Sequence, residues 1–279
     1  IIMNIEQLKD YIEFYFDNPE AMGFDEEIAF SFLDLLNRGM IRAANKSGKN
    51  WIVNTWVKKG ILLIFRKGKI SDMSVNDDFT YFDKHFLNLK NISIENNIRL
   101  VPGGSSIRTG AFVADGVVCM PPMYINIGSY IDEGCMIDSH ALVGTCAQIG
   151  KRVHISAAAQ VGGVLEPAGA RPVIIEDNVM IGGNCGVYEG VLIRERAVLG
   201  SGVILTSSTK VYDLVNERII TSTSEHPLEI PSGAVLVAGA RSLKSDFALE
   251  NGLSVYTPLI IKYRDEKTDA KTALTDDLR

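Results

Sequence analysis

Asp138 and His154 are the side chains whose types and spacing best suit acid–base chemistry in this sequence. Each adjoins an aliphatic residue, Ile137 or Ile155, in a repeat where such residues recur at every sixth position. If the two strands stack at about 4.8 Å, Asp138 points outward with His154 diagonally above it. A carboxylate held there and covered by another subunit could act as a general base, with its pKa moved by desolvation. Ordinary outward polar residues without a catalytic role remain the alternative interpretation.

The element that would position these residues is a long repeat with a period of six. An α-helix repeats at about 3.6 residues and an ordinary strand at about two, whereas a sustained period of six is typical of three short strands that form one triangular coil. We therefore expect a left-handed parallel β-helix from about Ile107 to Val211. The apolar positions of the repeat are Ile107, Val113, Cys119, Ile125, Ile131, Ile137, Val143, Ile149, Ile155, Val161, Ile175, Ile181, Val187, Ile193, Leu199, Leu205 and Val211.

The repeat divides the chain into three domains. Residues 1–98 form a mixed, mainly helical N-terminal domain, because apolar residues recur there at helical spacing. Residues 99–240 form the left-handed β-helix domain, and residues 241–279 form a small C-terminal β segment. The fold class is therefore mainly β.

Three segments interrupt or flank this regular pattern. Residues 166–172 contain Pro and Gly and are expected to leave the coil as a loop. The stretch between Val211 and Ile230 is expected to form a β-hairpin or an ordered flap. Residues 51–65 are too apolar for a surface loop, and we expect them to be the end of a helix that leads into a buried strand.

The composition argues against several classes of partner. The chain has 279 residues, of which 46% are hydrophobic and 22% charged, and its net charge is −6. Nucleic acids and anionic membranes are bound through an excess of Lys and Arg, so neither is expected as a partner. No apolar run approaches the roughly 18 residues that a membrane span requires, and the N-terminus lacks a secretory pattern. We therefore expect a cytoplasmic protein.

The cysteines and histidines show no metal-binding pattern. The cysteines have no CxxC spacing, and three of them fall on inward positions of the coil, where reduced cysteine packs as a small apolar residue. A γ-type carbonic anhydrase needs three histidines around a metal, and no close pair of histidines is present. No metal is therefore expected. These residues are Cys119, Cys135, Cys146, Cys185, His85, His140, His154 and His226.

The segments around Asp138 resemble a known enzyme family. YINIGSYIDEGCMIDSHALVGTCAQIG at 124–150 and GGVLEP at 162–167 resemble the tetrahydrodipicolinate N-succinyltransferases of the diaminopimelate–lysine pathway. Outside the repeat, WVKKGILLIFR at 56–66 and YFDK at 81–84 resemble the N-terminal domain of that family. The resemblance covers nearly the whole chain.

The resemblance implies an activity and two substrate-binding residues. It implies a homotrimer with active sites between the β-helices of neighbouring subunits. It also implies succinyl-CoA as co-substrate and no permanently bound cofactor. The acceptor would be the amine of 2-amino-6-oxopimelate, the ring-opened form of tetrahydrodipicolinate. Arg99, in IRLVPG, would bind a substrate carboxylate, and Asp138, in MIDS, would orient or deprotonate the amine.

CoA brings several negative charges to an acidic protein, so a few cations must face its phosphates. Lys210, Arg241 and Lys244 lie late in the repeat or just after it and are the candidates. A trimer is also expected because an isolated coil would expose apolar outward residues, namely Val118, Met120 and Met136.

The sequence departs from the family pattern near the second candidate carboxylate. The family motif Arg-Ser-Glu-Val-Val-Glu-Gly reads NCGVYEG at 184–190, so Gly186 replaces the first Glu, and Glu189 remains as the second catalytic candidate. The family's Trp two residues after the candidate base is His140 here. A related N-acetyltransferase also lacks that Glu, so an acetyl-CoA donor stays an alternative. The others are a sugar O-acetyltransferase with His154 or His140 as base, and a structural β-helix subunit without catalysis.

Overall fold

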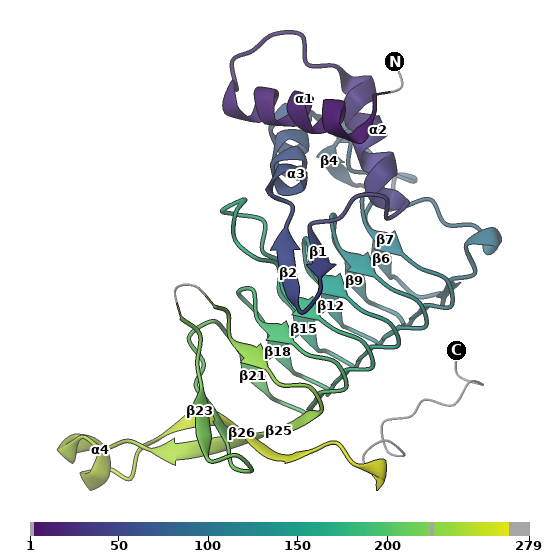
Figure 1. Ribbon diagram of the computed structural model, residues 1–279. Coiled ribbons are helices and arrows are strands. Elements are labelled where there is room, and N and C mark those ends of the chain that lie inside the picture. Colours follow the sequence, from purple (N-terminus) through teal and green to yellow (C-terminus); the bar gives the residue numbers. More distant parts are fainter. Residues whose placement is uncertain (1–2, 224–225, 268–279) are drawn as a thin grey trace.

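The computed structural model describes residues 3–223 and 226–267, and a parallel β-helix forms its centre (Figure 1). Each turn of the coil adds one strand to each of three sheets. The first sheet contains β5 (Arg99–Leu100), β8 (Val118–Cys119), β11 (Met136–Ile137), β14 (His154–Ile155), β17 (Met180–Ile181), β20 (Val198–Leu199) and β25 (Ala234–Ser242). The second contains β6 (Ser106–Ile107), β9 (Tyr124–Ile125), β12 (Leu142–Val143), β15 (Gln160–Val161), β18 (Gly186–Val187) and β21 (Ile204–Leu205). The third contains β7 (Phe112–Val113), β10 (Tyr130–Ile131), β13 (Gln148–Ile149), β16 (Ile174–Ile175), β19 (Leu192–Ile193) and β24 (Glu229–Ile230).

The register of these strands explains the period of six in the sequence. Ile137 pairs with Cys119 in the preceding coil and with Ile155 in the following coil, and all three side chains are fully buried. One inward residue on each side of the triangle therefore stacks on its equivalents, which fills the narrow interior. The interruption at 166–172 lies between β15 and β16 and contains no regular element, as the sequence predicted.

The N-terminal helices lie at one end of the coil and share a core with it (Figure 1). They are α1 (Ile5–Asp17), α2 (Glu26–Asn37) and α3 (Thr55–Lys67). Gly60 lets α3 approach α2 closely, because a Cβ at this position would lie 2.5 Å from the ring of Phe32. Ile127 and Cys146 of the coil join the same apolar cluster. Cys146, the cysteine outside the inward series, thus packs beneath the helices, and burial raises its thiol pKa to about 12.

The prediction for residues 51–65 was wrong in the order of its elements. β2 (Asn50–Val53) comes first, in a hairpin with β1 (Ala44–Ser47), and α3 follows it. The buried residues Val57, Ile61 and Ile64 recur at helical spacing, so the apolar run is one face of a helix. The remaining small elements of this part are β3 (Ile70–Asp72), β4 (Phe82–Lys84) and the 3-10 helix η1 (Ile94–Asn96).

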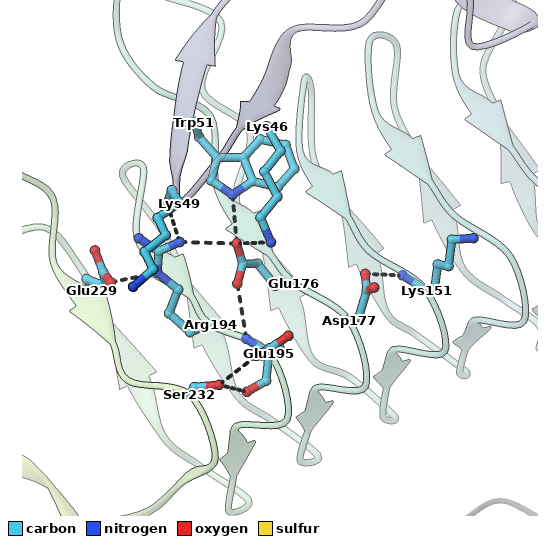
Figure 2. Close-up of polar contacts among 10 residues, drawn as sticks. All are labelled: Lys46, Lys49, Trp51, Lys151, Glu176, Asp177, Arg194, Glu195, Glu229 and Ser232. Carbon is cyan, nitrogen blue, oxygen red and sulfur yellow. Dashed lines mark hydrogen bonds and ion pairs between the residues drawn. The ribbon is translucent and has the colours of Figure 1, made fainter.

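Glu176 anchors the β1–β2 hairpin on the third sheet (Figure 2). Its Oε1 accepts hydrogen bonds from Trp51 Nε1 at 3.0 Å and Arg194 Nη1 at 3.2 Å, and lies 3.0 Å from Lys46 Nζ. Burial raises the pKa of Glu176, but the hydrogen bonds from Trp51 and Lys46 and the charge of Arg194 outweigh it and lower the pKa overall. Glu176 is therefore ionised at neutral pH and ties the N-terminal part to the coil.

An arm formed by β25, β26 (Ser254–Tyr263) and the short α4 (Asp246–Glu250) projects beyond the last coil (Figure 1). β26 pairs antiparallel with β25 and parallel with β22 (Val211–Asp213), which forms a hairpin with β23 (Arg218–Ile220). The hairpin predicted after Val211 is thus confirmed, apart from residues 224–225, which lie outside the described residues. β24 and β25 then add the last strands to the coil.

Candidate active site

Asp138 and His154 meet on the outward face of the first sheet. Asp138 follows β11, and its Oδ1 accepts a hydrogen bond from the Ser139 amide at 2.7 Å. Its Oδ2 lies 3.5 Å from His154 Nε2, on the next coil. The Asp138 side chain is 30% exposed and therefore accessible from outside the coil, whereas that of His154 is 16% exposed and its Nε2 atom is buried. A half-buried carboxylate that is oriented by a backbone amide and lies near an imidazole suits proton transfer.

Arg99 lies on the same sheet as Asp138. Arg99 pairs with Val118 on β8, and Val118 pairs with Met136 on β11, two residues before Asp138. Two strand spacings place the Cα atoms of Arg99 and Met136 about 10 Å apart. The exposed guanidinium group and the carboxylate therefore face one side of the coil, at a separation that a small dicarboxylic substrate can span.

The apolar outward residues between Arg99 and His154 are less exposed than the sequence analysis expected. Val118 is fully buried and Met136 is 8% exposed within the single chain. Met120 is half-buried. The expectation that an isolated coil leaves these residues uncovered is wrong for Val118 and Met136, because long neighbouring side chains in the same column can cover them. These residues therefore give no support to a trimer.

A separate hollow of about 570 Å³ lies where the second sheet turns into the third. Glu189 lines it beside Tyr188 and Arg171, and the loop at 163–172 forms its outer wall. Glu189 Oε2 accepts hydrogen bonds from the Ser207 amide at 3.1 Å and from the Ser207 hydroxyl at 2.5 Å. The size of the hollow is in the range of small-molecule sites.

One chain does not bring the two candidate carboxylates together. Asp138 lies where the first sheet turns into the second, whereas Glu189 lies at the next corner and two coils further along. Glu189 holds Ser207, and no described contact joins it to Asp138 or Arg99. The structure therefore places the two candidate carboxylates at two separate corners of the coil.

Comparisons with known proteins agree with this architecture. A family model described as the N-terminal region of tetrahydrodipicolinate N-succinyltransferase matches residues 7–66, and one described as the hexapeptide repeat of succinyltransferases matches residues 172–207. The 2,3,4,5-tetrahydropyridine-2,6-dicarboxylate N-succinyltransferase of Cupriavidus necator is 44% identical over 91% of this chain and 89% of its own length. That of Paraburkholderia phytofirmans is 41% identical over 98% of both chains. The chain belongs to the tetrahydrodipicolinate N-succinyltransferase family.

A solved structure supports the fold alone. A Campylobacter jejuni protein described as a 2,3,4,5-tetrahydropyridine-2-carboxylate N-succinyltransferase has a TM-score of 0.50 and 14% identity to this chain. The match covers 97% of this chain and 73% of that protein.

The space next to Gly186, where the family motif has Glu, is filled by Tyr188. A Cβ on Gly186 would lie 2.4 Å from Tyr188 Cε2, and a Cβ on Gly162 would lie 2.7 Å from Cδ1 of the same ring. The ring thus rests on a surface made by two glycines of neighbouring coils. Tyr188 stands where the motif has Val, so the two departures occur together in space, which the sequence analysis did not detect.

His140 lies in a second, shallower hollow of about 410 Å³, beside Tyr124 and Gln160 of the second sheet. Its backbone φ is +61°, and its amide donates to the Pro122 carbonyl at 2.5 Å. His140 is thus a corner residue of the coil, two positions after Asp138.

The three candidate cations lie at the C-terminal end of the coil. Lys210 directly precedes β22, whereas Arg241 lies near the outer end of β25 and Lys244 follows that strand. All three are exposed. β26 pairs with Arg241 at Val255 and with β22 at Leu259, so Lys210 is nearer the base of the arm and the other two are nearer its tip.

Two features are absent from residues 3–223 and 226–267. No group of three or more His, Cys, Asp or Glu side chains in these ranges is placed to hold a metal ion. No helix in the same part of the chain has the length and hydrophobicity needed to cross a membrane.

Proposed function

We propose that the protein transfers the succinyl group of succinyl-CoA to the amine of 2-amino-6-oxopimelate, the ring-opened form of tetrahydrodipicolinate. The observation that carries this proposal is the 41–44% identity to named N-succinyltransferases across almost the full length of both chains. The accessible carboxylate of Asp138 is the candidate base for that activity, and Arg99, on the same sheet, is the candidate carboxylate-binding residue.

The reaction needs a neutral amine next to the thioester carbonyl. Asp138 accepts a proton from the substrate ammonium group, and Arg99 binds a substrate carboxylate. The amine nitrogen then forms a bond to the thioester carbon and the carbon–sulfur bond breaks. The departing CoA thiolate takes up the second proton, which the nitrogen loses as it becomes an amide. His154 orients the Asp138 carboxylate. Holding the two substrates together supplies a large part of the rate enhancement, because a thioester is already activated.

We infer that the complete site forms between subunits of a homotrimer. The Asp138 face of one subunit would then lie opposite the hollow of its neighbour, which contains Glu189 and receives the acyl end of the thioester. This arrangement explains how two groups that are far apart in one chain can serve one reaction. Backbone amides at the coil corners can bind the oxyanion that forms during acyl transfer.

Succinyl-CoA is proposed as a co-substrate, without a permanently bound cofactor or metal. Its phosphates would bind Lys210, Arg241 and Lys244, which are exposed at the end of the coil where the arm begins. A net charge of −6 makes such local cations necessary for a polyanionic substrate.

The proposal also covers the handedness of the coil, the domain boundaries, and the location and partners of the protein. The coil is left-handed, as expected for hexapeptide repeats, and the domains are residues 1–98, 99–240 and 241–279, of which 268–279 lie outside the described residues. The protein acts in the cytoplasm, with neither nucleic acid nor membrane as a partner.

A comparison of acyl donors tests the proposed function. Purified protein is offered tetrahydrodipicolinate with succinyl-CoA or acetyl-CoA, and release of the free thiol is followed. We expect kcat/KM to be at least about tenfold higher with succinyl-CoA, a difference of about 1.4 kcal/mol. Equal or better turnover of acetyl-CoA would move the protein to the acetyltransferase alternative. A protein without catalysis would release thiol from neither donor.

A further inference from the structure

Lys58 is a fully buried lysine that the proposed reaction does not use. It lies on α3, and its side chain crosses to the loop at 163–172, where Nζ donates to the Ala170 carbonyl at 2.6 Å and to the Pro167 carbonyl at 3.2 Å. Burial lowers the pKa of Lys58. A lysine is costly to bury unless its ammonium group is hydrogen-bonded, so these two carbonyl groups stabilise its position.

The loop that Lys58 holds is the outer wall of the hollow. Glu166, Ala170 and Arg171 all line this space. From the other side, Arg171 Nε donates to the Gly190 carbonyl at 3.1 Å, next to Glu189. The loop is therefore attached to the N-terminal helices through Lys58 and to the coil corner that carries the candidate carboxylate through Arg171. At its start, the Val164 amide also donates to the Thr145 carbonyl of the coil at 3.1 Å.

We propose that Lys58 is a positioning residue that fixes the 163–172 loop as the wall of the acyl-donor site, and so couples the N-terminal domain to the binding of acyl-CoA. The proposal rests on the proposed function in one respect, namely that the hollow receives the acyl end of the thioester. Lys58 itself touches no substrate. It acts through the carbonyl groups of Pro167 and Ala170.

The position of the 163–172 loop depends on the Lys58 ammonium group, because this group donates hydrogen bonds on the buried side of the loop. Without it, the Ala170 carbonyl loses its donor and the Pro167 carbonyl keeps only the hydrogen bond from the Ala170 amide at 2.8 Å. An unpaired buried polar group is unfavourable. The loop can regain hydrogen bonds by moving outward to water, and this movement opens the hollow. The other contacts hold the two ends of the loop, through Val164 and Leu165 at its start and Arg171 at its end, so its middle, residues 166–170, is free to move outward.

The test compares Lys58→Met with Lys59→Met. Both variants remove an ammonium group from adjacent positions of α3, but Lys59 pairs with Asp17 on α1, at 3.0 Å, and not with the loop. Amide hydrogen exchange of the peptide that spans 163–172 is measured in the intact protein without substrate. We expect exchange at least about tenfold faster in Lys58→Met and unchanged in Lys59→Met.

Steady-state kinetics separate positioning from a general structural role. We expect Lys58→Met to raise the KM for succinyl-CoA at least about tenfold, with kcat within about threefold of the wild type. A merely structural role would lower the melting temperature and the active fraction, and so kcat, without changing KM. If Lys58→Met does not fold, Lys58→Gln, which keeps an N–H donor on a shorter chain, should show the same changes to a smaller degree.

Loop exchange and KM equal to those of the wild type in the folded variant would overturn the proposal, as would equal changes in both variants. Because the exchange measurement needs no turnover, it tests the attachment of the loop even if the wild type uses neither acyl donor. In that case the link to acyl-CoA is overturned, together with the proposed function.

Discussion

Asp138 Oδ2 lies 3.5 Å from His154 Nε2, and the two residues come from strands stacked in adjacent coils. The other carboxylate oxygen accepts the amide of Ser139. Asp138 therefore has one oxygen bonded to the backbone and one near the imidazole, on a side chain that is 30% exposed. This arrangement makes the aspartate the better candidate for the base and the histidine its support.

Replacing Asp138 with Asn should lower kcat at least about a hundredfold, because the change removes the proton acceptor but keeps the shape of the side chain. His154→Ala should lower kcat less than about tenfold. Steady-state thiol release measures both effects. The melting temperatures should change little, since both side chains project outward from the core. An inactive His154→Ala with an active Asp138→Asn would assign the base to His154 and favour the O-acetyltransferase mechanism.

Asp213 should make the stability of the protein depend on acidic pH. Its buried carboxylate accepts hydrogen bonds from Tyr263 Oη at 2.7 Å and Arg218 Nε at 3.0 Å. Burial raises its pKa, but hydrogen bonds from Asn216, Tyr263 and Arg218 outweigh this and lower the pKa to about 2. The folded state therefore binds fewer protons than the unfolded state between about pH 4 and pH 2, and this stabilisation disappears as the pH falls through that window.

The measurement is the melting temperature of the wild type and of Asp213→Asn from pH 7 to pH 2. We expect the melting temperature of Asp213→Asn to be lower than that of the wild type. This difference in melting temperature should be constant above about pH 5 and should shrink as the pH approaches 2. Asp17→Asn, which removes an exposed ion pair with Lys59, should differ little from the wild type throughout. A difference between the wild type and Asp213→Asn that persists undiminished at pH 2 would contradict the assignment.

A homotrimer should be the species in solution, because one chain keeps Asp138 and Glu189 at separate corners. Light scattering at micromolar concentration should give three times the 30.6 kDa mass of the chain. Mixing inactive Asp138→Asn with an inactive Glu189 variant should restore part of the activity if each site combines two subunits. A monomeric mass with full activity would rule out a shared site.

The sequence predicted the coil and the Asp138–His154 pair because both depend on a repeated register. Once Ile137 and Ile155 are known to stack, the neighbouring outward residues are placed as well. Other features depend on contacts between segments whose positions are not linked by the six-residue repeat. The burial of Val118, the bond from Lys58 to the 163–172 loop and the ring of Tyr188 on Gly186 were therefore missed. The order of β2 and α3 was missed because a buried helix face and a buried strand have similar composition.

Tyr188 and Gly186 should behave as one unit in mutagenesis. Any side chain at Gly186 meets the Tyr188 ring, since even a Cβ would lie 2.4 Å from Cε2. Gly186→Glu, which restores the family residue, should therefore displace the ring into the hollow and lower kcat/KM at least about tenfold. Adding Tyr188→Val, the family residue at that position, removes the obstruction.

The double variant should therefore lie within about threefold of Tyr188→Val alone, so that the two changes are strongly non-additive. A coupling of about tenfold corresponds to about 1.4 kcal/mol, well above the scatter found for independent sites. Ser201→Glu is the control, because it adds the same side chain at an exposed corner of the coil that does not line the hollow, and it should show no coupling to Tyr188. Additive effects of Gly186→Glu and Tyr188→Val would mean that the ring does not occupy the place of the missing glutamate. A double variant more active than the wild type would instead show that the glutamate, once accommodated, still contributes to acyl transfer on this scaffold.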